Sequence, residues 1–317
     1  MDVLIIGLSN IVTRRVLPAL RTLPSVGRID VATRKAEDAS LKAKWTHGEV
    51  YGDYSSALRQ TRAALAYVSL VNSEHERWAR WALDAGLHVV VDKPAFLGRE
   101  RAEVMLDLAA RHDVCLAEAV VFAHHPQIAA AKRVFTEAQS TPTRIAALFT
   151  FPPMDPANFR YRSSLGGGAV WDVGPYAAAA GRVFYGEEPE SVHCQILAHA
   201  ADVEIAFSTL QVFSEGRSLI GHFGFDAAYC NRLHLIGPTI AAELDRAFTT
   251  PPELANRLRV SGSSGDSTVE IPPTDSFACF MDHVLRCVAA REWGALAADL
   301  LADARTLDRM RTAATGG

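Results

Sequence analysis

Three side chains with acid–base chemistry stand where a fold could bring them to one substrate. Lys93 closely follows an apolar run that ends at Val91, and Asp172 and Tyr176 follow the glycine run Gly166–Gly168. Hydride transfer to a ketone makes an alkoxide that must be protonated. An ammonium can polarise the carbonyl or donate this proton, and a phenol can donate it too. We therefore predict Lys93 and Tyr176 as the proton-donating groups of a catalytic site.

Asp172 and Tyr176 are predicted to share one face of a helix, because they are four residues apart. The glycines before them would let the backbone approach a ligand closely. Asp172 is then expected to orient a substrate hydroxyl or Lys93 and not to exchange the proton itself. The alternatives are a core or interface aromatic for Tyr176 and a solvated surface charge for Lys93.

A dinucleotide-binding turn is expected where the first predicted strand, residues 3–6, ends. Of the three glycines in the usual fingerprint only Gly7 is present, and Ser9 and Val12 hold the other two places. Ser9 is small enough to let a pyrophosphate approach and could donate its hydroxyl to it. The alternative is a plain strand–helix turn. The expected cofactor contacts here are Gly7, Ser9, Asn10 and Ile11.

The second predicted strand ends in a hydroxyl, a guanidinium and an ammonium, which belong to Thr33, Arg34 and Lys35. Sheets that prefer NAD(H) place a carboxylate here for the ribose 2′-hydroxyl, whereas a 2′-phosphate needs cations. Asp30 lies in mid-strand, too early for that carboxylate. These residues favour NADP(H), with NAD(H) as the second choice and a solvated basic loop as the structural alternative.

The elements that must position these groups alternate in the first part of the chain. The expected strands are 3–6, 28–33, 63–71 and 87–91, and the expected helices are 11–23, 74–85 and 99–111. Such alternation predicts right-handed βαβ crossovers and a parallel sheet. Asn10 is expected to cap the first helix, and Pro18 to bend it.

After about residue 140 the runs become longer and often alternate. The expected strands are 143–151, 191–198, 203–213, 218–225, 232–236 and 240–248, and the expected helices are 174–185, 276–290 and 295–313. Long strands with few helices between them predict a mostly antiparallel sheet. We expect an α/β Rossmann domain with a parallel sheet over residues 1–120. An α+β domain with a large open sheet, for substrate binding and oligomerisation, would follow over 121–317.

Composition excludes several classes of protein. The 317 residues are 49% hydrophobic and 21% charged, which is typical of a globular chain of two domains. A net charge of −4 provides no positive field for nucleic acid or anionic lipid. No apolar run approaches the length of a membrane span. Five scattered cysteines without a C-x-x-C pair, and an N-terminus without a signal pattern, lead us to expect a cytoplasmic protein.

Three motifs in order are more specific than any of these residues alone. They are Asn72-Ser73-Glu74-His75, Asp92-Lys93-Pro94, and Gly166-Gly167-Gly168 followed by Trp171-Asp172 and Tyr176. Together they resemble the glucose–fructose oxidoreductase / inositol dehydrogenase (Gfo/Idh/MocA) family of two-domain dehydrogenases, over nearly the whole chain. That family carries Glu-Lys-Pro, often with a cis Lys-Pro bond, where this chain has Asp92. We therefore expect the contact of this carboxylate to the cofactor region to be rearranged.

Within the family the chain is most similar to reductases of the 3-keto group of nucleotide-linked deoxysugars. Tyr176 in place of His supports this, as do the segments 123–127, 158–160, 223–226, 229, 231–233 and 246–252. The resemblance implies an NADPH-dependent ketoreductase of a sugar or nucleotide-sugar substrate. The alternatives are oxidation of a free sugar, polyol or cyclic diol on the same fold, and a non-catalytic NADP-binding sensor.

Weaker candidates complete the expected site. Further cofactor contacts are assigned to Leu70, Asn72, His75, Asp92, Lys93 and Glu118. Substrate contacts are assigned to His125, Gln127, Arg160, Arg162, Asp172 and Tyr176, with the two arginines as anchors for a diphosphate. His124 and His125 lack a third ligand at useful spacing, so we predict no metal. The open face of the second sheet needs a cover, so we expect a homo-oligomer that forms through it.

Overall fold

The computed structural model describes residues 1–35, 45–46, 48–263 and 265–315. The chain forms two units, one of Met1–Ala119 with Phe277–Leu301 and one of Val120–Ser276 with the segment from Ala302 onward. The sequence analysis expected a single division at residue 120. The chain instead returns to the first unit through most of α9 (Ser276–Ala290) and the start of α10 (Gly294–Thr315).

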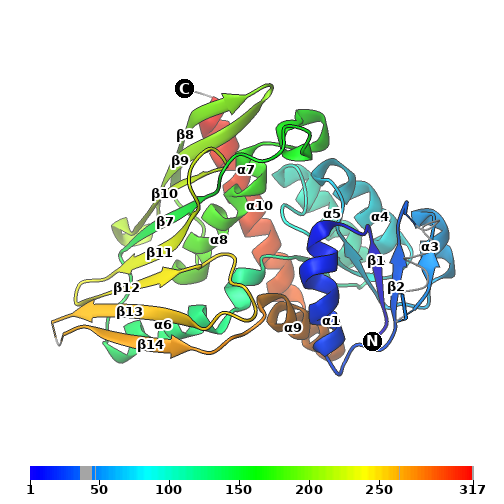
Figure 1. Ribbon diagram of the computed structural model, residues 1–317, viewed down its shortest axis with the longest axis horizontal. Helices are drawn as coiled ribbons and strands as arrows, with labels where there is room; N and C mark the ends of the chain where they lie inside the picture. The colour runs from blue at the N-terminus through cyan, green and yellow to red at the C-terminus, as the bar shows by residue number, and fades with distance from the viewer. Residues whose placement is uncertain (36–44, 47, 264, 316–317) are drawn as a thin grey trace. The chain divides into compact units, whose positions relative to one another are not determined.

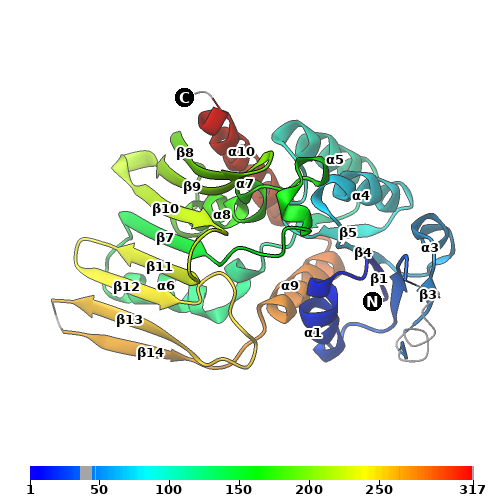
Figure 2. The same ribbon diagram turned by 45° about the horizontal axis from the view of Figure 1, so that its top comes forward.

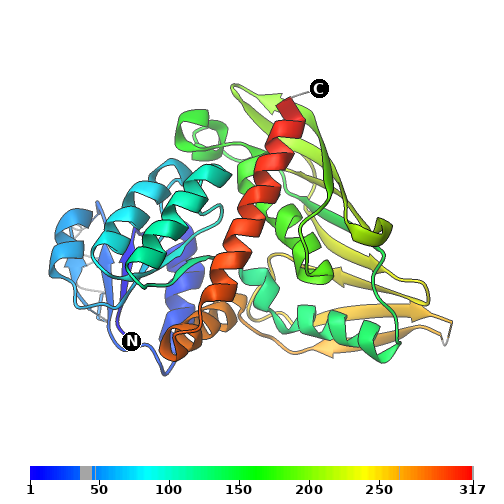
Figure 3. The same cartoon turned by 180° about the vertical axis from the view of Figure 1, so that it is seen from behind.

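In the first unit six described strands form one parallel sheet in the order β3-β2-β1-β4-β5-β6 (Figure 1). The strands are β1 (Val3–Ile6), β2 (Ile29–Ala32), β3 (Val50–Tyr51), β4 (Leu65–Val68), β5 (His88–Val91) and β6 (Leu116–Glu118). The helices are α1 (Leu17–Thr22), α3 (Tyr54–Gln60), α4 (His75–Asp84) and α5 (Arg99–Arg111). β1 and β4 are buried throughout, since helices lie on both faces of the sheet (Figures 1 and 3). The predicted Rossmann sheet is confirmed.

The helix after β1 differs from its prediction at the start. The hydroxyl of Ser9, and not the side-chain amide of Asn10, accepts the N–H of Val12 at 3.1 Å. The turn Val12–Val16 is π-helical and leads into α1, with Pro18 in its first turn. Proline has no N–H to donate to the preceding turn, and the wider π-helical turn lies directly ahead of it.

In the second unit eight described strands form a sheet in the order β14-β13-β12-β11-β7-β10-β9-β8 (Figure 2). They are β7 (Arg144–Thr150), β8 (Ser191–Ala200), β9 (Val203–Val212), β10 (Ser218–Gly224), β11 (Cys230–Ile236), β12 (Ile240–Asp245), β13 (Asn256–Gly262) and β14 (Ser267–Ile271). The described neighbours are antiparallel except β7 and β10, which are parallel. The mostly antiparallel sheet is confirmed. The hairpin of β13 and β14 was missed because each strand carries only two alternating apolar residues, Leu258 and Val260 in β13 and Val269 and Ile271 in β14.

Helices cover one face of this second sheet (Figure 3). They are α6 (Pro126–Glu137), α7 (Ala169–Asp172), α8 (Gly174–Tyr185) and the later part of α10. The opposite face carries exposed apolar side chains on four neighbouring or nearby strands: Leu197, Leu210, Ile220 and Ile236. Leu210 and Ile220 are directly paired across β9 and β10. None of the helices in the described part of the chain is long and apolar enough to cross a membrane.

Candidate active site

Most of the predicted cofactor residues lie at the carboxyl ends of parallel strands. Gly7 follows β1, Thr33–Lys35 follow β2, Leu70 lies after β4, and Asp92 and Lys93 follow β5. In open α/β sheets ligands bind at this edge, where the strand order reverses. The order here reverses between β1 and β4. The structure therefore brings these residues to one edge of the first unit.

Gly7 is the glycine that this turn requires. Its φ of +96° lies in the left-handed region, and a Cβ there would meet the carbonyl oxygen of Ser69 at 2.2 Å and Cδ2 of Leu70 at 2.6 Å. The turn after β1 thus packs its bare backbone against the segment after β4. A larger residue would push apart the two strand ends between which the expected pyrophosphate site lies.

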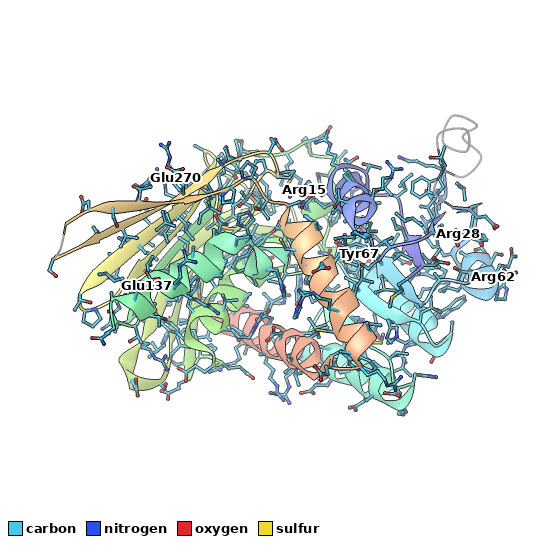
Figure 4. All side chains as sticks on the ribbon, turned by 90° about the horizontal axis from the view of Figure 1, so that it is seen from below. Arg15, Arg28, Arg62, Tyr67, Glu137 and Glu270 are labelled. Carbon is cyan, nitrogen blue, oxygen red and sulfur yellow. The ribbon has the colours of Figure 1, made fainter. Side chains whose placement is uncertain are left out.

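Asp92, which is one methylene shorter than glutamate, accepts hydrogen bonds from two hydroxyl groups. Tyr67 donates its phenol to Oδ1 at 2.5 Å, and Ser69 donates its hydroxyl to Oδ2. Tyr67 is buried within the first unit (Figure 4). Burial raises its pKa well above the ordinary value and Asp92 raises it further, so the phenol stays protonated and acts as the donor.

The segment that carries Lys93 is held by a buried histidine. The peptide bond between Lys93 and Pro94 is cis. Nδ1 of His75 lies 2.9 Å from the carbonyl oxygen of Pro94, and Nε2 lies 3.1 Å from that of Leu70. A neutral imidazole carries one N–H, so His75 donates to one of these two carbonyl oxygens and lies against the other, between the segment after β4 and the segment after β5. His75 was predicted to contact the cofactor. The contacts with the carbonyl oxygens of Pro94 and Leu70 are additional contacts within the protein.

Glu118 supports the same segment from the other side. Its Oε1 accepts the backbone N–H of Ala95 at 2.8 Å. Glu118 was predicted as a cofactor contact, and its contact with Ala95 could not be read from the spacing. Asn72 is also buried, at the turn that leads into α4. The Lys93 segment is thus fixed by residues distant in sequence.

Replacing His75 with glutamine is expected to flatten the dependence of stability on pH. Burial lowers the pKa of His75 below its ordinary value of 6.5. As the pH falls below about 6.5, the unfolded chain takes up a proton that the folded chain resists, so the wild type loses stability from there toward the lower folded pKa. His75→Gln lacks this contribution.

Urea unfolding between about pH 7 and pH 5 measures this difference. Exposed His199, replaced by glutamine, is the matched control and should keep the wild-type slope. Equal slopes for wild type and His75→Gln would show that His75 binds its proton equally well in both states.

The carboxylate of Asp30 makes hydrogen bonds within the first unit, as its position in mid-strand suggested. Its Oδ1 accepts the backbone N–H of Glu49 at 2.8 Å and Nε of Arg28 at 2.6 Å. Arg28 is labelled in Figure 4. A carboxylate with these partners is poorly placed to bind a ribose hydroxyl. This carboxylate therefore gives no support to NAD(H).

The three residues after β2 form a turn with two exposed cations. The backbone N–H of Lys35 donates to Oγ1 of buried Thr33 at 3.2 Å, which shapes the turn. Arg34 and Lys35 are exposed. The guanidinium carbon of Arg34 lies 5.9 Å from the ring centroid of Tyr54. The hydroxyl of Thr33 is thus part of the turn, while both cations face solvent at the strand end.

Asp172 and Tyr176 do not share a continuous helix, so that prediction was wrong. α7 ends at Asp172 and α8 begins at Gly174, with Val173 between them at φ −112°. Pro175 lacks the N–H that a continuous helix would need at this point, and it lies in the first turn of α8 instead. The two side chains are therefore positioned by two helices and not by one helical face.

Asp172 is paired with Arg160. Nε of Arg160 donates to Oδ2 of Asp172 at 2.7 Å, and the Asp172 side chain is 8% exposed. Burial opposes the charge on Arg160, but the attraction of Asp172 prevails and raises the arginine pKa. The sequence analysis assigned these two residues to different ligand contacts and missed the pair. Arg162 remains exposed.

Tyr176 is held by an aromatic cluster in the second unit. Its ring centroid lies 5.0 Å from that of Phe149, 5.4 Å from Phe248 and 6.0 Å from Phe122, in edge or tilted arrangements. Such pairs prefer a defined geometry. The ring is thereby oriented while the residue stays half-buried.

Gly168 is required by the chain's own packing. Its φ is +111°, and a Cβ would meet Oε1 of Glu204 at 2.5 Å. The same carboxylate oxygen accepts the backbone N–H of Val170 at 3.3 Å, near the start of α7. Sequence reasoning explained the glycine run by the approach of a ligand and missed Glu204, which comes from the distant strand β9.

His125 and Gln127 make hydrogen bonds within the second unit. Both are buried, and Nδ1 of His125 accepts the N–H of Gln127 at 3.2 Å to cap α6. The Gln127 amide donates to the carbonyl of Ala247 at 2.9 Å and accepts from Asn256 at 2.5 Å. The Gln127 amide is thus hydrogen-bonded inside the second unit, and its predicted substrate contact stays a prediction.

Comparison with known proteins covers both parts of the chain. Residues 1–120 match the family described as an oxidoreductase family with an NAD-binding Rossmann fold, and residues 130–266 match the GFO/IDH/MocA C-terminal domain. A dTDP-3,4-didehydro-2,6-dideoxy-alpha-D-glucose 3-reductase of Actinomadura kijaniata is 31% identical over 98% of this chain and 94% of its own. A D-xylose 1-dehydrogenase (NADP(+)) of Haloferax volcanii is 25% identical over 91% and 89%.

A solved structure extends the match to the whole fold. It is KijD10, a 3-ketoreductase from Actinomadura kijaniata in complex with NADP and TDP-benzene. It aligns with a TM-score of 0.93 at 29% identity and covers 99% of this chain and 98% of its own. The predicted two-part fold is confirmed over its full length.

Proposed function

Because the chain belongs to the Gfo/Idh/MocA family of oxidoreductases, we propose that it reduces the 3-keto group of a nucleotide-activated deoxysugar with NADPH. The observation that carries this proposal is the full-length similarity to a relative named as a dTDP-sugar 3-reductase, 31% identical over 98% of this chain. The motifs with Lys93 and Tyr176 support it.

The residues at the carboxyl edge of the parallel sheet fit NADP(H). The bare backbone at Gly7 suits a pyrophosphate, and Arg34 and Lys35 would bind the 2′-phosphate. Exposed Asn10 and Ile11 stand at the start of the following helix and would contact the dinucleotide, as would Leu70 and Asn72 after β4. When bound, NADPH supplies the hydride.

Lys93 and Tyr176 are proposed to handle the proton. Hydride delivery leaves negative charge on the former ketone oxygen, and an ammonium can stabilise this charge while a phenol protonates it. His75 and Glu118 would act by holding the Lys93 segment. Arg160 would act through Asp172, whose carboxylate it binds, and exposed Arg162 is proposed to contact the diphosphate.

The function is tested with the purified protein and a panel of substrates. We expect oxidation of NADPH, followed by absorbance, with a nucleotide-linked 3-keto-deoxysugar. Reduction of NADP⁺ with free D-xylose or a cyclic diol, without turnover of any nucleotide-linked sugar, would replace the proposal by the alternative of sugar or diol oxidation. The observation that supports this alternative is the 25% identity to the D-xylose 1-dehydrogenase of Haloferax volcanii.

Replacing Arg34 with alanine is expected to weaken NADPH binding by about tenfold or more, because a charge-assisted hydrogen bond to phosphate contributes about 1.5–3 kcal/mol. NADH lacks the 2′-phosphate, so its affinity should stay within about twofold. Fluorescence titration of both nucleotides measures the change. Arg59→Ala, at an exposed arginine of the same unit, is the control. Equal weakening of both nucleotides would contradict a role for Arg34 at the 2′-phosphate.

We also propose a cytoplasmic homo-oligomer. The five free cysteines support the location. The exposed apolar side chains on the open face of the second sheet support assembly through that face. Ile220→Glu, at a side chain 55% exposed, is expected to reduce the mass measured by light scattering to that of a smaller species. An unchanged mass would place the assembly on another surface.

A further inference from the structure

A chain of hydroxyl groups connects the turn after β1 with the residue before Lys93. Oγ of Ser9 lies 2.8 Å from Oγ of Ser69, which in turn donates to Oδ2 of Asp92. Tyr67 donates to the other carboxylate oxygen at 2.5 Å. Tyr67 and Ser69 are buried, so the middle of this chain is shielded from water. We refer to Ser9, Ser69 and Asp92 as the hydroxyl relay.

The direction of each hydrogen bond in the relay follows from counting protons. An ionised carboxylate can only accept, so the single proton of Ser69 is given to Asp92. Ser69 must then accept from Ser9, which gives its own single proton. Oγ of Ser9 also accepts the N–H of Val12 at 3.1 Å. The relay therefore runs from Ser9 through Ser69 to Asp92.

This direction changes the expected role of Ser9. The sequence analysis had Ser9 donate its hydroxyl to a pyrophosphate, but in this structure the proton is already used on Ser69. A phosphate at this turn would then have to rely on backbone N–H groups. What the hydroxyl does contribute is a link between the turn after β1 and the carboxylate next to Lys93.

The two ends of the relay are also where the sequence departs from its motifs. Ser9 stands where the fingerprint has its second glycine, and Asp92 stands where the family has glutamate. A glycine at position 9 has no hydroxyl to donate. A glutamate at position 92 would have a side chain one methylene longer than the aspartate that Ser69 contacts here. The two departures therefore fit one another.

We propose that Ser9 and Ser69 are positioning residues for Lys93, because they hold the carboxylate of the residue that precedes it. The inference rests on the proposed function, since it assumes that Lys93 assists the transfer of a proton. The relay fixes the end of β5 relative to the turn after β1, so it sets where the Lys93 segment begins. Small displacements of a positioned group lower the rate strongly.

The relay itself is tested without any ligand, by a double-mutant cycle of thermal unfolding. Ser69→Ala is expected to lower Tm by about 2–4 °C, because it removes one hydrogen bond to a carboxylate. In an Asp92→Ala background the same change should shift Tm by less than about 1 °C, since the acceptor is gone. Equal shifts in both backgrounds would show that Ser69 does not act on Asp92.

The positioning role is tested by kinetics. Ser69→Ala is expected to lower kcat about tenfold and to leave both KM values within about twofold, because binding groups are untouched while Lys93 is displaced. Ser9→Ala should give a smaller loss of kcat, since Ser69 can still donate. Ser55→Ala is the matched control, because its hydroxyl donates to Asp53 at 2.6 Å at an exposed helix start. Unchanged kcat in Ser69→Ala would overturn the role.

A third measurement separates this inference from the proposed function. The rate at which a small amine-acylating reagent modifies Lys93 in the free protein, measured by peptide mass spectrometry, needs neither cofactor nor substrate. We expect Ser69→Ala to change this rate about threefold, because the amine then lies in a different position relative to its neighbours. Absence of turnover in the wild type would refute the function alone, whereas an unchanged labelling rate would refute the positioning of Lys93.

Discussion

Replacing Lys93 with alanine is expected to lower kcat by about 10²–10⁴-fold, the usual contribution of a positioned proton donor. The affinity for NADPH should change by less than about threefold, because His75 and Glu118 contact the backbone of this segment and both remain in the variant. Steady-state kinetics and fluorescence titration measure the two quantities on the same preparation. The exposed Lys132→Ala variant is the control and should behave as wild type.

The pattern of the loss identifies the role of Lys93. A fall in kcat and in kcat/KM by the same factor is expected for an interaction made only in the transition state. A rise in KM with unchanged kcat would instead make Lys93 a substrate-binding residue. Tyr176→Phe in the same assay shows whether the phenol is the second donor, because the ring contacts with Phe149, Phe248 and Phe122 need no hydroxyl.

The fold could be predicted well because its signals are local. Val3–Ile6 is a run of apolar residues next to Gly7, and it forms the buried strand β1. The helices α5 and α8 also begin and end at the residues that the sequence predicts. Where the local signal is weak, as in β13 and β14, pairing of β13 with β12 and of β14 with β13 decides the structure. That pairing cannot be read from the segment alone.

The candidate site was predictable in its residues but less so in their contacts. The motifs located Lys93, Asp172 and Tyr176, yet the partner of Asp172 is Arg160, twelve residues earlier on a different turn. The break at Val173 also follows from Pro175, whose missing N–H outweighs the four-residue spacing. Spacing predicts which face a residue takes only where the helix continues.

Replacing Asp303 with alanine is expected to lower the free energy of unfolding by about 3–5 kcal/mol. Asp303 on α10 and Arg182 on α8 form a bidentate pair, with both N–O distances 2.7 Å. Their side chains are 4% and 15% exposed, so the variant leaves a guanidinium with little water and without this carboxylate. α8 also carries Tyr176 in its first turn, so we expect a further loss of activity at temperatures where α8 loosens.

The size of this effect depends on burial, which gives the experiment its control. The pair of Arg286 with Asp282 has a similar distance of 2.9 Å, but its side chains are 68% and 45% exposed. Asp282→Ala should therefore cost only about 0–1 kcal/mol in the same urea unfolding experiment. Replacing both partners, as Arg182→Met with Asp303→Leu, should recover most of the loss, because no uncompensated charge is left in the interior. A loss for Asp303→Ala no larger than that for Asp282→Ala would mean that water reaches Arg182 and that this pair does not anchor α8.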